Sequence, residues 1–278
     1  MTDLAIPMPS TRGSRATVYG RVFIGLLARD LRVLRRDFVP FVIRTAMNPL
    51  LFVFVFTYVF PKIGQGFASS NGASFGTVLL PGLISVSIMF QGIAAVAMPL
   101  SVEFGATGEI YDRVMSPLPV AGVAIEKVVF SALQSAIAAM IVFPLVILIP
   151  STPVHFAVSS WPLLVVMVAL ASLASGAMGL VIGTAIQPQQ IGLIFGVVVV
   201  PVTFLGCVYY PWFLLHHVRW LQYLVLINPI VYMSEGLRAA LTPEIPHMPV
   251  WAVLLALTVS VAVMGGLGVK GFLKRVVS

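Results

Sequence analysis

The amino-acid sequence predicts an all-α integral membrane protein, and three observations support this fold class. First, 59% of its 278 residues are apolar and only 9% are charged, whereas about 25% of the residues in a soluble domain are charged. Second, the apolar runs are about 20 residues long, which is the length that a helix needs to cross a bilayer. Third, most of the charge lies within the first 44 residues or in short segments between the apolar runs. Because a helix satisfies its own backbone in lipid, we expect six transmembrane helices rather than a barrel.

The N-terminal region, residues 1–37, is predicted to be cytoplasmic and to contain an interfacial amphipathic helix over 15–37. Apolar side chains recur there at helical spacing, and arginines occupy most of the remaining surface. This pattern is typical of a helix that lies along the membrane among the lipid headgroups. A soluble amphipathic helix packed on a partner is the alternative. No cleavable signal precedes it, so the first span is expected to serve as the insertion signal.

Residues 38–278 are predicted to form one transmembrane domain. Its six expected spans are 38–60, 77–100, 123–149, 162–186, 191–209 and 250–268. Small residues in the fourth span, at Ser172, Gly176, Gly179 and Gly183, recur near one helical face and predict close packing against another helix. The single cysteine, Cys207, can form no disulfide within the chain and is expected to be a small packing residue.

Segment 101–122, between the second and third spans, is unusually rich in charge. Within it, residues 108–115 can form a short amphipathic helix with Ile110, Val114 and Met115 on one side. The sequence Ser-Pro-Leu-Pro over 116–119 then ends the helix, because proline lacks an amide donor. We expect a compact, charged projection at the membrane surface, with an apolar face that can contact a partner.

Segment 210–247 contains two stretches, 212–226 and 229–241, that have helical periodicity but are too short to cross a bilayer. Asn228 and Pro229 are expected to cap and begin the second stretch. This pattern predicts a short re-entrant or surface-lying helical hairpin between the fifth and sixth spans. Glu235 and Arg238 lie three residues apart, and a surface ion pair is their simplest interpretation.

The distribution of basic residues predicts the orientation. If both termini are cytoplasmic, thirteen of the sixteen lysines and arginines fall on the cytoplasmic side, and only Lys62, Arg219 and Arg238 fall outside. This asymmetry fits the positive-inside rule. It places segment 101–122 in the cytoplasm and segment 210–247 on the outer face. The net charge of +7 therefore indicates contact with the lipid bilayer and its anionic headgroups rather than with nucleic acid.

The sequence contains no phosphate-binding loop of the Gly-x-x-x-x-Gly-Lys-Ser/Thr type, so no cofactor is expected on this chain and any use of ATP is expected on a partner. The chain is not expected to be an enzyme, because its histidines are scattered and no Asp or Glu lies well inside a span. A cargo path would use the few polar and the larger apolar side chains of the spans, although packing also explains each of them. These residues are Asn48, Phe90, Gln91, Met98, Gln134 and Thr203.

Four features occur together: the arginine-rich helix before the first span, the stretch EFGATGEIYDRVMSPLP from Glu103, the stretch NPIVYMSEGLR from Asn228, and six spans with both ends inside. In combination they resemble the type 2 permeases of bacterial ATP-binding-cassette exporters, over nearly the whole chain. The resemblance implies a permease half in the inner membrane. It would pair with a second permease copy, as a homodimer or a heterodimer, and bind two cytosolic ATPase subunits that hold ATP and magnesium.

The resemblance also implies residue roles. Segment 101–122 corresponds to the coupling region, with ATPase contacts at Glu103, Glu109, Tyr111, Asp112, Arg113 and Met115. The helix over 15–37 corresponds to the connecting helix, with contacts at Arg29, Arg32, Arg35 and Arg36. The outer hairpin would help to close the extracellular gate, through Asn228, Pro229, Tyr232, Glu235 and Arg238.

The implied function is ATP-driven export of a drug-like or lipid-linked cargo, with glycan export as the alternative cargo class. Two other functions stay open. A membrane-embedded enzyme acting on lipids would need clustered acids, histidines or metal ligands near the membrane surface. A non-transporting scaffold would bind an ATPase without moving cargo, and ATPase activity that a cargo stimulates would exclude it.

Overall fold

The computed structural model describes residues 15–63, 75–107, 110, 115, 117–149, 154–187 and 190–277. Over these residues the chain forms helices and connecting turns without a strand, which confirms the all-α prediction. Five helices in this part of the chain are long and apolar enough to cross a membrane, and a bent helix pair would make a sixth if it counts as one span. The five are Phe38–Val59, Gly76–Gly105, Val120–Leu148, Trp161–Ala185 and Val250–Val276.

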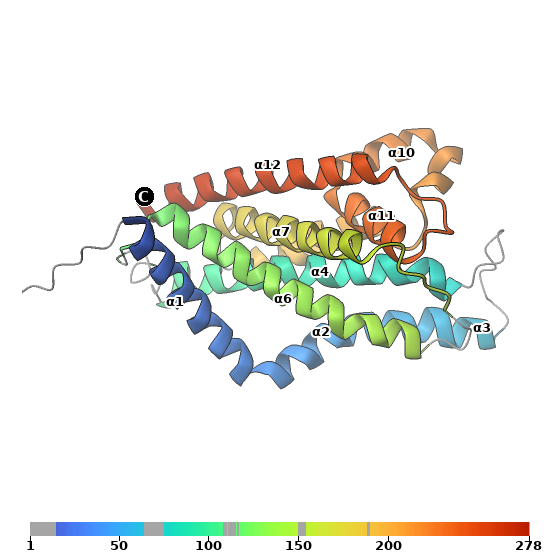
Figure 1. Ribbon diagram of the computed structural model, residues 1–278, viewed down its shortest axis with the longest axis horizontal. Coiled ribbons are helices and arrows are strands. Elements are labelled where there is room, and N and C mark those ends of the chain that lie inside the picture. The colour runs from blue at the N-terminus through green and yellow to red at the C-terminus, as the bar shows by residue number, and fades with distance from the viewer. Residues whose placement is uncertain are drawn as a thin grey trace, which may run out of the picture.

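The first two helices, α1 (Arg15–Arg36) and α2 (Phe38–Val53), meet in a sharp bend at Asp37 (Figure 1). Pro40 explains the bend, because a proline ring clashes with the carbonyl four residues earlier, here that of Arg36. Helix α1 therefore ends where the interfacial helix was predicted to end. The first span continues beyond α2 as a π-helical turn, η1 (Phe54–Val59), and a short α3 (Phe60–Lys62).

Helix α4 (Phe75–Val102) is the centre of the bundle. Of the residues in its most apolar stretch, 67% are buried, whereas only 18% are buried in the corresponding stretch of the first span and 17% in that of the last. It packs against α6 (Val120–Leu148) and α7 (Trp161–Ala185), and α12 (Val250–Val277) packs against α7. The last helix is longer than predicted, because it continues past Gly268 to Val277.

The small residues of α7 confirm the predicted close packing. A Cβ on Gly179 would lie 2.9 Å from the backbone of Ile93 in α4, and one on Gly183 would lie 3.0 Å from the Cα of Ala97. On the neighbouring face, a Cβ on Gly176 would lie 2.6 Å from the Ser131 hydroxyl of α6. Backbones at this separation leave no room for a larger side chain.

The fifth predicted span is shorter than expected. Helical structure runs through α8 (Ile191–Ile194), η4 (Phe195–Val199) and α9 (Val200–Phe204), and it ends at Phe204 rather than at residue 209. The chain then turns, and Cys207 adopts a φ of 51°, in the left-handed region. The turn carries the Cys207 carbonyl into the bundle, and its partner there is described below.

The predicted outer hairpin forms a bent pair of helical arms. The first arm contains η5 (Trp212–His217), α10 (Arg219–Leu224) and η6 (Val225–Ile227), and the second arm is α11 (Pro229–Leu241). The segments Arg219–Ile227 and Pro229–Leu241 meet at 98°. Every residue of α11 except Tyr232 is buried, so this arm is seated inside the bundle rather than lying on its surface.

Figure 1 places the functional elements at opposite ends of the bundle. The start of α1, the end of α4 and the C-terminus of α12 lie at one end, which we call the α1 end. The buried helix α11, together with α10 and α3, lies at the other, which we call the α11 end.

Candidate functional site

At the α1 end, the link between α4 and α6 begins with a buried ion pair. Helix α4 passes into a π-helical turn, η2 (Glu103–Thr107), and Lys127 Nζ lies 2.8 Å from Glu103 Oε1. Both side chains are less than a tenth exposed. Removing one partner of such a pair costs about 3–5 kcal/mol, because the other charge stays in the interior. The resemblance implies an ATPase contact for Glu103, but its carboxylate is directed into the bundle, toward α6.

Arg275, near the end of α12, joins three elements at the α1 end. Its Nη1 donates to the carbonyls of Gly183, at 2.9 Å, and Ile186, at 2.9 Å, which lie where α7 ends. These carbonyls have no partner within their own helix, and a cation there also complements the helix dipole. The guanidinium lies 4.7 Å above the ring of Phe104 in η2. The sequence reasoning used Arg275 only for orientation, and so missed this contact.

Only part of the predicted coupling helix lies within the described residues. Ile110 is fully buried, whereas Met115 is 82% exposed, so these two residues do not form the single apolar face that the sequence predicted. The contact of Met115 with an ATPase stays a prediction. Ile110 belongs to a small core at the α1 end with Leu118, Leu180 and Phe272. Glu109, Tyr111, Asp112 and Arg113 lie outside the described residues, so their contacts stay predictions.

The connecting helix packs on this same core. Val22, Phe23 and Leu26 of α1 contact it, while the predicted ATPase contacts are all exposed along α1; these are Arg29, Arg32, Arg35 and Arg36. Helix α1 therefore combines an apolar face against the bundle with a basic outer surface, as the amphipathic pattern predicts.

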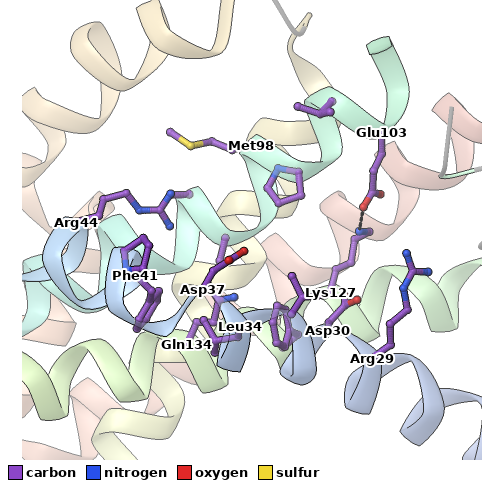
Figure 2. Close-up of a pocket in the computed structure, with 17 residues that line it drawn as sticks. Arg29, Asp30, Leu34, Asp37, Phe41, Arg44, Met98, Glu103, Lys127 and Gln134 are labelled. Carbon is purple, nitrogen blue, oxygen red and sulfur yellow. Dashed lines mark hydrogen bonds and ion pairs between the residues drawn. The ribbon is translucent and has the colours of Figure 1, made fainter. Parts of the chain in front are cut away.

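A groove of about 730 Å³ lies between the bend at Asp37 and the helices α4 and α6 (Figure 2). Two residues of the predicted cargo path, Met98 and Gln134, line it. Gln91 lies behind Gln134 and donates to its side-chain oxygen at 2.8 Å, and the Thr45 hydroxyl donates to Gln91 at 3.3 Å. These bonds join α2, α4 and α6 beside the groove.

The other residues of the predicted cargo path do not meet there. Phe90 packs against Phe195, with ring centroids 6.5 Å apart. Thr203 is buried and donates to the carbonyl of Val199, the last residue of η4, at 2.7 Å. The side chain of Asn48 lies outside the described residues. Of the described members of the set, only Met98 and Gln134 therefore line this groove.

At the α11 end, Glu235 and Arg238 form a fully buried ion pair, so the prediction of a surface pair is wrong. Arg238 Nη1 donates to Glu235 Oε1, and Arg238 Nη2 donates to the Cys207 carbonyl at 3.2 Å. The two oxygens of Glu235 also accept the backbone N–H groups of Trp212 and Met248, each at 2.9 Å. One carboxylate thus joins α11 to the segments before α10 and before α12.

The remaining predicted gate residues hold the hairpin together. Asn228 accepts the Ile230 N–H at 3.1 Å, which confirms its role as the cap of α11, and its amide donates to the Val202 carbonyl at 2.6 Å. Pro229 is the first residue of α11, where its missing N–H costs nothing. The Tyr232 hydroxyl donates to the Leu226 carbonyl at 2.8 Å. Within the described ranges, no three His, Cys, Asp or Glu side chains gather to hold a metal ion.

Comparison with known proteins agrees with this arrangement. The profile described as "ABC-2 type transporter" matches residues 21–242, from the middle of α1 through α11. The inner membrane transport permease YadH of Escherichia coli strain K12 is 28% identical over 223 residues, which cover 78% of this chain and 84% of YadH. The YadH proteins of Escherichia coli O157:H7 and Shigella flexneri match to the same extent. The chain therefore belongs to the ABC-2 type transporter family and is a multi-pass permease of the inner membrane.

Proposed function

We propose that this chain is the permease subunit of an ATP-binding-cassette exporter, with amphipathic drug-like or lipid-linked molecules as its cargo. The observation that carries the proposal is the anchoring of the α4–α6 link. Through Glu103 and Lys127 the link is bonded to α6, and through Phe104 it contacts Arg275, which holds the ends of α7 and α12 together. A force on the link is therefore transmitted to several spans at once.

The force would come from a separate ATPase subunit. We infer that two ATPase copies, each holding ATP and magnesium, bind below segment 101–122 and the basic surface of α1, and that two permease copies form the channel. A homodimer is the simplest assembly, since one chain then supplies both halves. Closure of the ATPases on ATP would move the link and tilt the spans, which would open the α11 end.

The export direction follows the resemblance to type 2 exporters, and the orientation and cargo class rest on two arguments. By the positive-inside rule the basic residues favour a cytoplasmic α1 end, which would put the ATPase-facing surface where ATP is available. The spans are strongly apolar, with mean hydropathies from 1.8 to 2.3, and a permease with such walls suits cargo that partitions into lipid.

Charge reversal in the link tests the proposal. We expect Asp112→Arg or Arg113→Glu to reduce co-purification of the ATPase with this chain, and to reduce the ATPase activity that cargo stimulates in liposomes. Glu244→Arg is the matched control, because Glu244 is exposed near α11, at the opposite end. Unchanged binding and transport in both link variants would remove these residues from the interface.

A labelling experiment tests the orientation independently. Met115 is 82% exposed, so a Met115→Cys variant should react with a membrane-impermeant maleimide only in inside-out vesicles. The native Cys207 adds little background, because it is buried and its pKa is raised to about 12 by burial. Labelling of intact cells at position 115 would reverse the proposed topology.

A further inference from the structure

We propose that the groove at the bend between α1 and α2 binds the headgroup of a zwitterionic membrane phospholipid, of the phosphatidylethanolamine type. The groove volume of about 730 Å³ lies within the range of small-molecule sites, about 300–1,000 Å³. Its walls come from the interfacial helix, the first span, α4 and α6. Because α1 is predicted to lie along the membrane surface, we expect its junction with the first span, and hence the groove, at the depth of the lipid headgroups.

The lining combines charged and apolar side chains. Asp30 and Asp37 come from the end of α1 and the bend that follows it, and Lys127 comes from the part of α6 near its start. Ala94, Met98 and Phe130 lie one or more helical turns inside α4 and α6 and supply apolar surface. A lining of both kinds suits an amphipathic molecule with a polar head and apolar chains.

The charges of the lining balance. Three basic side chains, Arg29, Arg44 and Lys127, face three acidic ones, Asp30, Asp37 and Glu103. A groove with balanced charges has no net attraction for an anionic headgroup. A zwitterionic headgroup can instead pair its phosphate with a basic side chain and its ammonium group with an acidic one. The exposed arginines elsewhere on α1 attract anionic lipid as well, but without a pocket and in a way that salt screens.

Two of these charges are available to a ligand. Lys127 and Glu103 neutralise each other, but among the described residues neither Asp37 nor Arg44 has a side-chain hydrogen bond or ion pair. Figure 2 shows both side chains directed into the groove, the Asp37 carboxylate near its middle.

The order of these two residues matches the lipid. Arg44 lies about 10 Å further along the first span than Asp37, at about 1.5 Å per residue. In phosphatidylethanolamine the phosphate adjoins the glycerol and the amine is at the free end. Arg44 would therefore bind the phosphate, for which guanidinium is well suited, and Asp37 would bind the ammonium group.

The test compares phosphatidylethanolamine with phosphatidylglycerol of the same acyl chains, since the second lipid keeps the phosphate but lacks the amine. The purified full chain is delipidated in detergent, and bound lipid is counted by native mass spectrometry at moderate salt. We expect phosphatidylethanolamine to bind about fivefold more tightly than phosphatidylglycerol, the scale of one partly exposed charge contact. Equal binding, or preference for phosphatidylglycerol, would overturn the proposal.

Variants assign the two contacts. Asp37→Asn should abolish the preference and leave phosphatidylglycerol binding unchanged, whereas Arg44→Gln should weaken both lipids about fivefold. Lys270→Gln is the control, because Lys270 is exposed on α12 and does not line the groove. Met98→Trp, which fills the groove without changing charge, should reduce phosphatidylethanolamine binding if a charge variant fails to fold. Preference retained in Asp37→Asn, or unchanged phosphatidylethanolamine binding in Met98→Trp, would refute the site. This assay needs neither ATPase nor transport, so its failure leaves the proposed function standing.

Discussion

The buried ion pair of α11 gives a prediction whose size follows from its contacts. In Arg238→Met the apolar replacement fills similar space, but the Glu235 carboxylate keeps only the backbone N–H groups of Trp212 and Met248. A buried charge that loses its partner costs about 3–5 kcal/mol. At about 2 °C for each kcal/mol in a chain of this size, the melting temperature of the purified chain should fall by about 6–10 °C.

Removing both charges should cost less than removing one. In the double variant Glu235→Gln, Arg238→Met no charge remains buried. Compared with Arg238→Met, the unpaired charge is gone, and in exchange one backbone N–H loses its acceptor because the glutamine amide replaces one oxygen, at about 1–3 kcal/mol. The Cys207 carbonyl lacks its Arg238 donor in both variants. The assay is thermal unfolding in detergent followed by tryptophan fluorescence, because Trp212 lies beside the pair. Glu244→Gln, an exposed carboxylate at the same end, should melt like the native chain.

Two results would refute this reasoning. If Arg238→Met melts within about 2 °C of the native chain, the carboxylate is solvated and α11 is not seated in the bundle. If the double variant melts below Arg238→Met, the pair is not the source of the cost, since a charge without a partner would then be less harmful than no charge.

Three further predictions concern other parts of the bundle. Arg275→Gln should lower the free energy of unfolding by about 1–3 kcal/mol and should separate ATP hydrolysis from transport, because the carbonyls at the end of α7 lose their donor. Arg275→Lys should restore less than half of the lost stability, since one ammonium cannot replace the planar guanidinium. Melting curves and transport assays measure both effects. Gly179→Ala should lose about 1–3 kcal/mol by overpacking against Ile93, whereas Gly265→Ala, with no atom within 4 Å of the new Cβ, should melt like the native chain. Because burial raises the pKa of Cys207 to about 12, the thiol stays protonated at pH 8, so maleimide labelling should be slow in the folded chain and complete after unfolding.

The sequence predicts the helices well where one physical signal dominates. The predicted apolar runs of the first four spans end within a few residues of the observed helices, because the thickness of the bilayer core sets the length of a span. The end of α1 at Arg36 agrees with Pro40, whose ring disfavours a continuous helix past the Arg36 carbonyl. The small-residue face of α7 is predictable as well, since only close approach of another helix explains four such residues at helical spacing.

What the sequence does not predict depends on contacts between distant segments. The apolar run beyond Phe204 gives no sign that the chain turns there, because the partner of the Cys207 carbonyl is Arg238, thirty-one residues later. The burial of Glu235 is not predictable from the sequence either, because two opposite charges three residues apart suit a surface as well as an interior. Its buried position depends on the backbone N–H groups of Trp212 and Met248, which lie far from it in the sequence. A signal was present in the largely apolar composition of 229–241, which leaves little surface for water.

The groove was only partly predictable. The sequence indicates Met98 and Gln134 as cargo-path candidates, because one is a large apolar and the other a polar side chain within a span. The bend that brings Asp37 and Arg44 opposite them arises from the relative placement of α1, α2 and α4. Helical periodicity describes each helix singly and carries no information about the angle between two of them.

The burial of α11 between other segments also constrains the order of events during synthesis and membrane insertion. Its ion pair is buried partly by the segment before α12, through the Met248 N–H, and α11 packs against α12 itself. During synthesis α11 leaves the ribosome before either exists. Until the last span has inserted, α11 therefore lacks part of its final surroundings, and its carboxylate and guanidinium depend on water for solvation.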